Sequence, residues 1–166
     1  PSADLVLITG GLGPTDDDRT VGVLADTLRA SLIKDEATID GLRRLFAERG
    51  LAMPKSNEKQ GLHPEGSLLI PNPAGTAPGI VWKTKVEGKE TPVCIACFPG
   101  VPRELKALWP LSLNAFVGLG LPIGTTQQKA LFLNCFGLGE SHIMERLAPA
   151  LPIVGVELDP YVAQGE

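Results

Sequence analysis

A glycine-rich stretch beside three acidic residues is the part of this sequence best suited to bind a phosphate group. In "LITGGLGPTDDDRT" an apolar run ends at Gly10, Gly11 and Gly13, and three consecutive aspartates follow. A glycine-rich turn between a strand and a helix lets backbone N–H groups point at an anion, and the positive end of the helix adds to the attraction. The stretch matches neither the dinucleotide fingerprint nor the phosphate loop. By itself it predicts either a phosphate cradle or only a tight turn.

The aspartates favour a divalent cation at the same loop. Asp17 and Asp18 would repel a bare phosphate unless a cation lay between them, and Mg²⁺ is usually held by one or two carboxylates together with phosphate oxygens. Thr15 would complete the phosphate cradle. The alternative is that Asp17 or Asp18 caps the following helix and complements its positive end. We expect both aspartates to be metal ligands and catalytic residues.

Two polar loops further along the chain could contact the same ligand. "PKSNEKQGLHPEG" contains a polar group able to reach a nucleobase, a ribose or a phosphate, although a solvated surface segment explains it equally. "NPAGTAPG" fixes a loop whose N–H and hydroxyl groups could bind a ligand, or it is a plain turn. The polar residues of the first loop are Asn57, Lys59, Gln60 and His63, of which we expect Asn57 and Lys59 to bind substrate. In the second loop we expect Asn72, Gly75 and Thr76 to bind substrate.

The segment "FPGVPREL" repeats the design of the first glycine-rich stretch. An apolar strand ends at Gly100, and Arg103 and Glu104 lie in the first turn of a predicted helix. Arg103 could contact phosphate, and Glu104 could activate water or be a second metal ligand, unless the two form a surface ion pair. Ligands of open α/β sheets bind beyond the carboxyl ends of the strands. Two such loops therefore favour one shared site.

Alternating strands and helices must position these loops. "DLVLITG" has the unbroken apolar character of a buried parallel strand, and apolar spacing predicts a helix from Thr20. "DEATIDGLRRLFAERG" predicts a helix with acidic residues at its start and Gly50 at its end. Residues 51–79 are predicted to form a long loop with one short strand at "SLLIP", and "GIVWKTKV" and "TPVCIACF" to form a hairpin. "RELKALWPLSLNAFVGLG" predicts a helix interrupted at Pro110.

The pattern restarts after a cluster of glycine and proline at residues 118–126, where we place a domain boundary. "QQKALFLNCFG" predicts a strand and "IVGVELDP" another. Between them "GESHIMERLAPAL" predicts a helix that directs Ile143, Met144 and Leu147 inward.

The three cysteines do not indicate a metal or redox centre. Cys94 and Cys97 form a C-x-x-C within a predicted strand, where these two positions point to opposite faces. We expect buried structural thiols.

The overall composition limits the classes of partner that the protein is expected to bind. The 166 residues carry a formal net charge of −4, which favours neither nucleic acid nor an anionic membrane surface. The sequence contains no long apolar span and does not start like a signal peptide, so a cytoplasmic setting is expected.

Taken in order, "ITGGLGPTDDDRT", "PKSNEKQGLHPEG", "PNPAGTAPG" and "FPGVPREL" resemble the CinA family (competence/damage-inducible protein CinA). The resemblance implies that residues 1–118 form a three-layer α/β domain of the MoaB/Mog-like, molybdopterin-binding type with a mostly parallel sheet. It implies that residues 126–166 are the start of a small α+β, KH-like domain. Family members open with a strand that bears a "GDE"-like acidic motif, followed by a helix and another strand, and this segment would precede Pro1. The first strand seen here would then be an interior one whose edge lacks its neighbour.

The resemblance also implies a function, namely metal-dependent hydrolysis of the pyrophosphate of ADP-ribose or a related dinucleotide by attack of water. The metal would be Mg²⁺, Mn²⁺ or Co²⁺, with K⁺ as a further candidate. The partner would be a nucleotide-type small molecule, and the protein a homo-oligomer, either a dimer or a trimer. One alternative is a module that binds molybdopterin or a nucleotide without turnover. Another is a fragment that is inactive without its N-terminal segment.

Overall fold

The computed structural model describes residues 3–121, 123, 131–151 and 154. The chain divides into two compact units, Pro1–Thr126 and Gln127–Glu166. The first unit contains a four-stranded sheet and the candidate loops, and the second contains one α-helix among its described residues. No helix among the described residues is long and apolar enough to cross a membrane.

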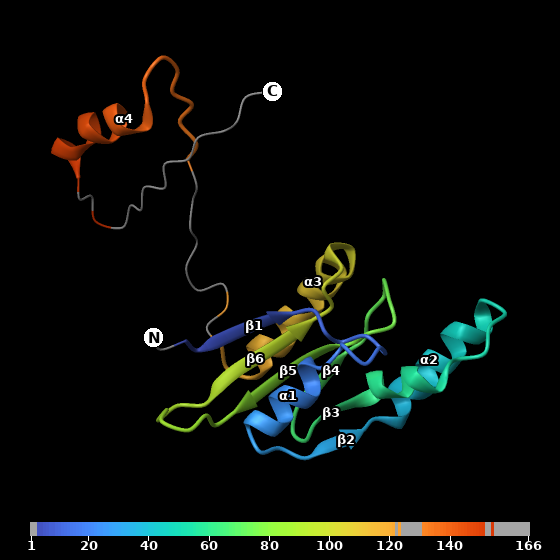
Figure 1. Cartoon of the computed structure of the whole chain (residues 1–166). Helices are drawn as coiled ribbons and strands as arrows, with labels where there is room; N and C mark the ends of the chain where they lie inside the picture. The colour runs from blue at the N-terminus through green and yellow to red at the C-terminus, as the bar shows by residue number, and fades with distance from the viewer. Residues whose placement is uncertain (1–2, 122, 124–130, 152–153, 155–166) are drawn as a thin grey trace. The chain divides into compact units, whose positions relative to one another are not determined.

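The sheet of the first unit is mixed (Figure 1). Its strands, in spatial order, are β1 (Leu5–Thr9), β6 (Val93–Phe98), β5 (Gly79–Thr84) and β4 (Leu68–Ile70). β1 pairs parallel with β6, whereas β6–β5 and β5–β4 are antiparallel. The predicted α/β class is confirmed, as is the hairpin of β5 and β6. Parallel pairing is limited to β1 and β6 among the described strands, because the connections between β4, β5 and β6 are too short for a parallel crossover.

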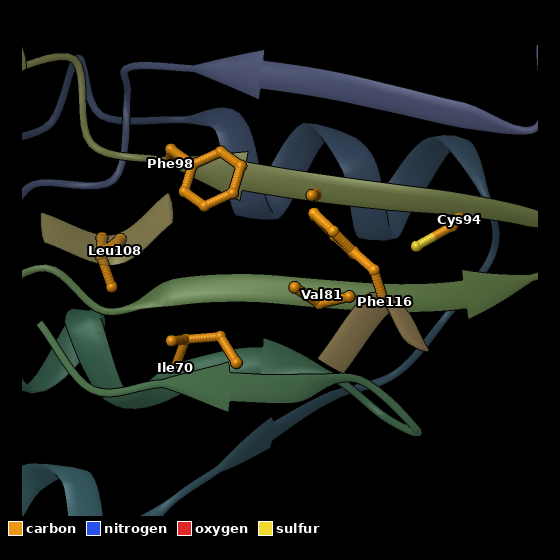
Figure 2. Close-up of a cluster of buried hydrophobic side chains, with 7 residues drawn as sticks. Ile70, Val81, Cys94, Phe98, Leu108 and Phe116 are labelled. Atoms are coloured by element: carbon orange, nitrogen blue, oxygen red, sulfur yellow. The ribbon is translucent and has the colours of Figure 1, made fainter. Parts of the chain in front are cut away.

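Helices cover both faces of this sheet, which confirms the three layers. On one face Cys94, Ala96 and Phe98 of β6 pack with residues of α3 (Pro102–Gly118). Figure 2 shows Cys94 and Phe98 together with Leu108 and Phe116 of that helix. On the other face the alternate residues of β6, including Cys97, pack with residues of α1 (Thr20–Thr27). Every residue of β6 is buried. Cys94 and Cys97 therefore lie on opposite faces of a buried strand, as predicted.

β1 is an edge strand within the described part of the chain. The parallel pairing predicted for it is confirmed, but the predicted burial is wrong, since Val6 and Leu7 remain 37% and 49% exposed. The physical reason is its position, because β1 has β6 as a neighbour on one side only. An unbroken apolar run indicates a strand but does not specify where in the sheet the strand lies.

A smaller two-stranded sheet lies in the segment between β1 and β4. β2 (Leu32–Lys34) pairs antiparallel with β3 (Leu62–Pro64), and α2 (Glu36–Glu48) and the 3₁₀ helix η1 (Lys55–Gly61) connect them. The predicted bounds of α2 are confirmed, because the Asp35 carboxylate accepts the Thr38 N–H at its start and Gly50 takes a φ of +69° just beyond its end. Sequence patterns missed β2, β3 and η1. These elements are too short to show a period.

The predicted interruption of a helix at Pro110 is wrong. α3 continues from Pro102 to Gly118 although Pro110 lies inside it and cannot donate a backbone hydrogen bond. Leu108, Ser112 and Phe116 of this helix are completely buried. Tertiary packing of that face therefore outweighs the cost of one proline, in keeping with the dominance of packing over intrinsic propensity in protein helices.

In the second unit, only the helix agrees with what the sequence predicts. α4 (Glu140–Leu147) is confirmed, and Ile143, Met144 and Leu147 are its partly buried residues. The short 3₁₀ helix η2 (Ala148–Ala150) follows it. The strand predicted in "QQKALFLNCFG" is wrong for residues 131–137, because no strand among the described residues of this unit offers it a partner. The strand predicted in "IVGVELDP" lies outside the described residues, apart from Val154.

Candidate functional site

Three loops meet at one end of the main sheet, at the ends of its strands. Residues 10–19 follow β1, residues 99–101 follow β6, and residues 71–78 precede β5. Parallel β1 and β6 end at the same edge, and antiparallel β5 begins there. The Gly10 N–H donates to the Phe98 carbonyl at 2.8 Å, and a Cβ on Gly100 would lie only 3.3 Å from the Gly10 Cα. The loops after β1 and β6, which the sequence predicts to share a site, are thus in direct contact.

Glycine is required where the first loop turns into α1. Gly10 and Gly11 have φ angles of +91° and +69°, in the left-handed region that favours glycine. The Thr20 hydroxyl donates to the Gly10 carbonyl at 2.8 Å, and the Thr20 N–H donates to the Gly11 carbonyl at 3.2 Å. A Cβ on Gly11 would lie 2.2 Å from the Thr20 Oγ1. The loop is therefore wrapped tightly around the first residue of α1.

Asp18 closes this loop and does not cap α1, so the capping alternative is wrong. The N-cap residue is Arg19, and no side chain caps the helix. The Asp18 carboxylate instead accepts the N–H of Thr15 at 3.0 Å and the Thr15 hydroxyl. These bonds, led by the one from the hydroxyl, hold the pKa of Asp18 below its usual value, with the Gly13 N–H contributing. A side chain at Gly13 would collide with this carboxylate, and Asp17 is exposed beside it.

Glu104 and Arg103 turn towards the loop before β5. Asn72 Nδ2 donates to Glu104 Oε2 at 2.7 Å and to the Ala77 carbonyl at 2.8 Å. Arg103 Nη2 donates to the Ala74 carbonyl at 3.1 Å. A Cβ on Gly75 would lie 2.3 Å from Glu104 Oε2, so only glycine leaves room for the carboxylate. Arg103 and Glu104 therefore each bind this loop. They do not form with each other the surface ion pair that the sequence left open.

η1 connects the first loop to the loop before β5 through Gln60. Its Nε2 donates to Thr76 Oγ1 at 3.1 Å and to the Leu12 carbonyl at 3.5 Å, and its Oε1 accepts from Asn57 Nδ2 at 3.0 Å. Asn57 and Gln60 are buried, and Lys59 between them donates to the Thr15 carbonyl at 2.6 Å. Gln60 is not among the residues that the sequence predicts to bind substrate. The only available signal was an amide side chain in a polar, loop-forming segment.

His63 does not belong to this network, because it is buried with its Nδ1 2.8 Å from the Ser67 hydroxyl. A pocket of about 80 Å³ lies beside the glycine-rich loop. Gly11, Gly13, Asp18, Lys59 and Gln60 provide its polar lining, and Val21, Leu32, Leu62 and Ile80 are among its apolar residues. Of the predicted site residues, Gly11, Gly13, Asp18 and Lys59 thus line one pocket. Asn72, Gly75, Arg103 and Glu104 form a second cluster that adjoins it through Thr76 and Gly100.

The carboxylates available for a metal are few. Within the described residues, no group of three or more His, Cys, Asp or Glu side chains is placed to hold an ion. Asp18 uses Oδ2 for both Thr15 contacts, which leaves Oδ1, and Asp17 is exposed. Asp17 and Asp18 are the carboxylates that would be used by an ion such as Mg²⁺, which keeps several waters and takes one or two carboxylates plus ligand phosphates.

Comparison with known proteins agrees with this architecture. Residues 1–117 match the family described as "Probable molybdopterin binding domain". CinA-like proteins of Nostoc punctiforme and Gloeobacter violaceus are 36% and 39% identical over 99% of this chain. The chain spans 38% and 37% of the length of these curated relatives.

A solved structure shows the same fold. The crystal structure of the protein CinA from Thermoplasma acidophilum is 33% identical, with a TM-score of 0.56 over 68% of this chain and 62% of that chain. The resemblance inferred from the four loop motifs is thereby confirmed. The chain belongs to the family of probable molybdopterin-binding domains and, within it, to the CinA-like proteins.

Proposed function

We propose that this chain contributes a metal-dependent hydrolase site for the pyrophosphate bond of ADP-ribose or a related dinucleotide. The proposal rests on one observation: three loops meet at the end of the sheet where β1 and β6 terminate. Asp18 lies in the loop after β1, and Glu104 lies in the first turn of α3, directly after the loop that follows β6; these two loops touch at Gly10 and Gly100. A carboxylate beside each of two touching loops, together with a glycine-rich turn, suits a reaction at a phosphate, because water must be activated where negative charge is also being bound.

Cations and donors at the site would bind the phosphates. Lys59 spends one of its three N–H donors on the Thr15 carbonyl, which leaves two for a ligand. The Thr76 hydroxyl oxygen accepts from Gln60, so its own proton is directed away from that bond and can meet a phosphate oxygen. Arg103 is exposed and could add a further donor.

Glu104 would take the proton of the attacking water. Its Oε2 is held by Asn72, and the ionised carboxylate retains Oε1 as an acceptor. The water oxygen would form a bond to phosphorus while the bond from phosphorus to the bridging oxygen breaks, and the electron pair would leave with the second phosphate. With ADP-ribose the products would be AMP and ribose phosphate.

Asp17 and Asp18 would hold the divalent metal, with water and phosphate oxygens as its other ligands. When bound, such an ion supplies positive charge that polarises the phosphoryl oxygen. The test is a double variant, Asp17→Asn with Asp18→Asn, assayed for AMP release from ADP-ribose with Mg²⁺. We expect metal-stimulated release to be abolished, and unchanged turnover would refute the metal role. Asp26→Asn, an exposed aspartate in α1, is the matched control.

A binding module without turnover is the second candidate, and the description of the matched family favours it. The same loops would then hold molybdopterin or a nucleotide. Calorimetry with ADP-ribose, FAD and a pterin, run beside the AMP assay, separates the two functions. Tight binding without AMP release would favour the module. A homo-oligomer stays a prediction, which light scattering tests.

A further inference from the structure

A second hollow adjoins the pocket at the glycine-rich loop. It has a volume of about 420 Å³, and both hollows share Lys59 and Leu62 in their lining. Its charged residues come from β2, η1 and the first loop. They are Lys34, Lys55, Lys59, Glu58 and Asp16. We call this hollow the lysine basin.

The acidic residue of η1 in the basin is already neutralised by its neighbours. Glu58 contacts Lys34 Nζ at 3.4 Å and Arg43 Nη2 at 3.1 Å. These two cations, Lys34 first, hold the pKa of Glu58 below its usual value. Lys34 also contacts Glu36 at 3.2 Å. The ion pairs therefore use up the charges of Lys34 and Glu58 and contribute little net potential to the basin.

Lys55 and Lys59 are the cations left to act on a ligand. Neither takes part in an ion pair among the described residues, and the Lys59 ammonium lies on a backbone carbonyl of the first loop. Asp16 is the other carboxylate of the lining besides Glu58, and it is exposed as Lys55 is, so solvent screens both charges. Ser56 adds a hydroxyl to the lining. The basin thus offers two ammonium groups and a hydroxyl, a donor set suited to a phosphate.

We infer that the lysine basin binds the second phosphate of a diphosphate whose first phosphate lies at the glycine-rich loop. Lys59 lines both hollows and lies between the two phosphate positions. The inference rests on the proposed function, because it names a second contact of the same ligand. Its consequence is selectivity, since a monophosphate would meet only the first position. The site would then prefer nucleoside diphosphate derivatives to ligands with one phosphate.

Binding of two inorganic probes tests the inference without turnover. In calorimetry at low salt we expect pyrophosphate to bind about tenfold more tightly than phosphate, as one additional charged hydrogen bond would provide. Lys55→Ala should weaken pyrophosphate binding by about the same factor and leave phosphate binding unchanged. Glu58→Gln should strengthen pyrophosphate binding about twofold, because it leaves Lys34 and Arg43 without the carboxylate that now neutralises them. Lys85→Ala, an exposed lysine just after β5, is the control.

Three results would overturn the inference: no pyrophosphate binding by the unmodified chain, equal affinity for both probes, or a Lys55→Ala affinity within twofold of the unmodified chain. Unchanged urea unfolding of Lys55→Ala shows that a loss of binding is not a loss of fold. If ADP-ribose is not cleaved but pyrophosphate binding depends on Lys55, the hydrolase proposal fails and the basin stands. If the Lys55→Ala variant releases AMP at an unchanged rate and binds pyrophosphate with unchanged affinity, the inference about the lysine basin fails and the hydrolase proposal stands.

Discussion

Replacing Gln60 with leucine removes the amide that joins η1 to two of the site loops. The side chain is 5% exposed. It donates to Thr76 Oγ1 at 3.1 Å and to the Leu12 carbonyl at 3.5 Å. It accepts from Asn57 Nδ2 at 3.0 Å, and Asn57 is itself only 6% exposed. Leucine keeps much of the volume and removes every one of these bonds.

The expected loss in the free energy of unfolding is about 2–4 kcal/mol. Leaving the buried Asn57 amide without its acceptor costs about 1–3 kcal/mol, and losing the bond to Thr76 costs about 1 kcal/mol. The contact with the Leu12 carbonyl lies at the limit of hydrogen-bond distance and adds little. The estimate therefore depends mainly on the unpaired Asn57 amide.

Urea unfolding followed by the fluorescence of Trp82 and Trp109 measures this loss, because both tryptophans lie in the first unit. Asn114→Leu, at an exposed position of α3, should stay within about 0.5 kcal/mol of the unmodified chain. Adding Asn57→Ala to Gln60→Leu removes the unpaired amide, so the double variant should be more stable than the sum of the single losses implies. A loss below about 0.5 kcal/mol for Gln60→Leu, or strict additivity in the double variant, would refute the reasoning.

Three further predictions concern stability and reactivity. Burial raises the pKa of Cys97 to about 11, so at pH 8 its alkylation should be at least about a hundredfold slower than that of the exposed Cys135. Equal rates under native conditions would contradict the burial of β6. Hydrogen bonds from Thr38 hold the pKa of Asp35 below its ordinary 3.8, so the stability supplied by this carboxylate is complete above that pH and is lost as pH falls through the lower folded value. Asp35→Asn should flatten that part of the acid dependence in urea unfolding, and an unchanged slope would exclude Asp35 as its source. Pro110→Ala restores a backbone donor inside α3 and should raise the free energy of unfolding by about 1–3 kcal/mol. A lower stability of that variant would show that the proline ring itself contributes to packing.

Local patterns in the sequence predicted several strands and helices of the first unit and its glycine-rich loops, whereas the three layers were implied by the family resemblance. The apolar run from Val93 to Phe98 predicts a buried strand, and its alternating contacts with α3 and α1 confirm that both faces are covered. The spacing in α2 predicts its start and end, because capping at Asp35 and the turn at Gly50 are local effects. Glycines at loop positions likewise indicate backbone geometry that other residues resist.

Some sequence patterns are compatible with more than one structure, and only the tertiary structure shows which one forms. The apolar run of β1 predicts a strand, but only the strand order shows that it lies at an edge of the described sheet. Pro110 disrupts an isolated helix, and only the buried face of α3 explains why this one continues. The segment at residues 131–137 is apolar enough for a strand, yet pairing depends on a neighbour that the sequence of the segment does not specify.

The candidate site divides in the same way. The sequence by itself determined which residue types are present: the glycines at 10, 11 and 13, the aspartates beside them, and the polar loops before β5 and after β6. Only the tertiary structure decided their partners. It tied Asp18 to Thr15, directed Glu104 onto Gly75, and placed Gln60 between two loops. The physical reason is that glycine geometry and capping depend on adjacent residues, whereas the partner of a polar side chain depends on which distant segments the fold brings within hydrogen-bond distance.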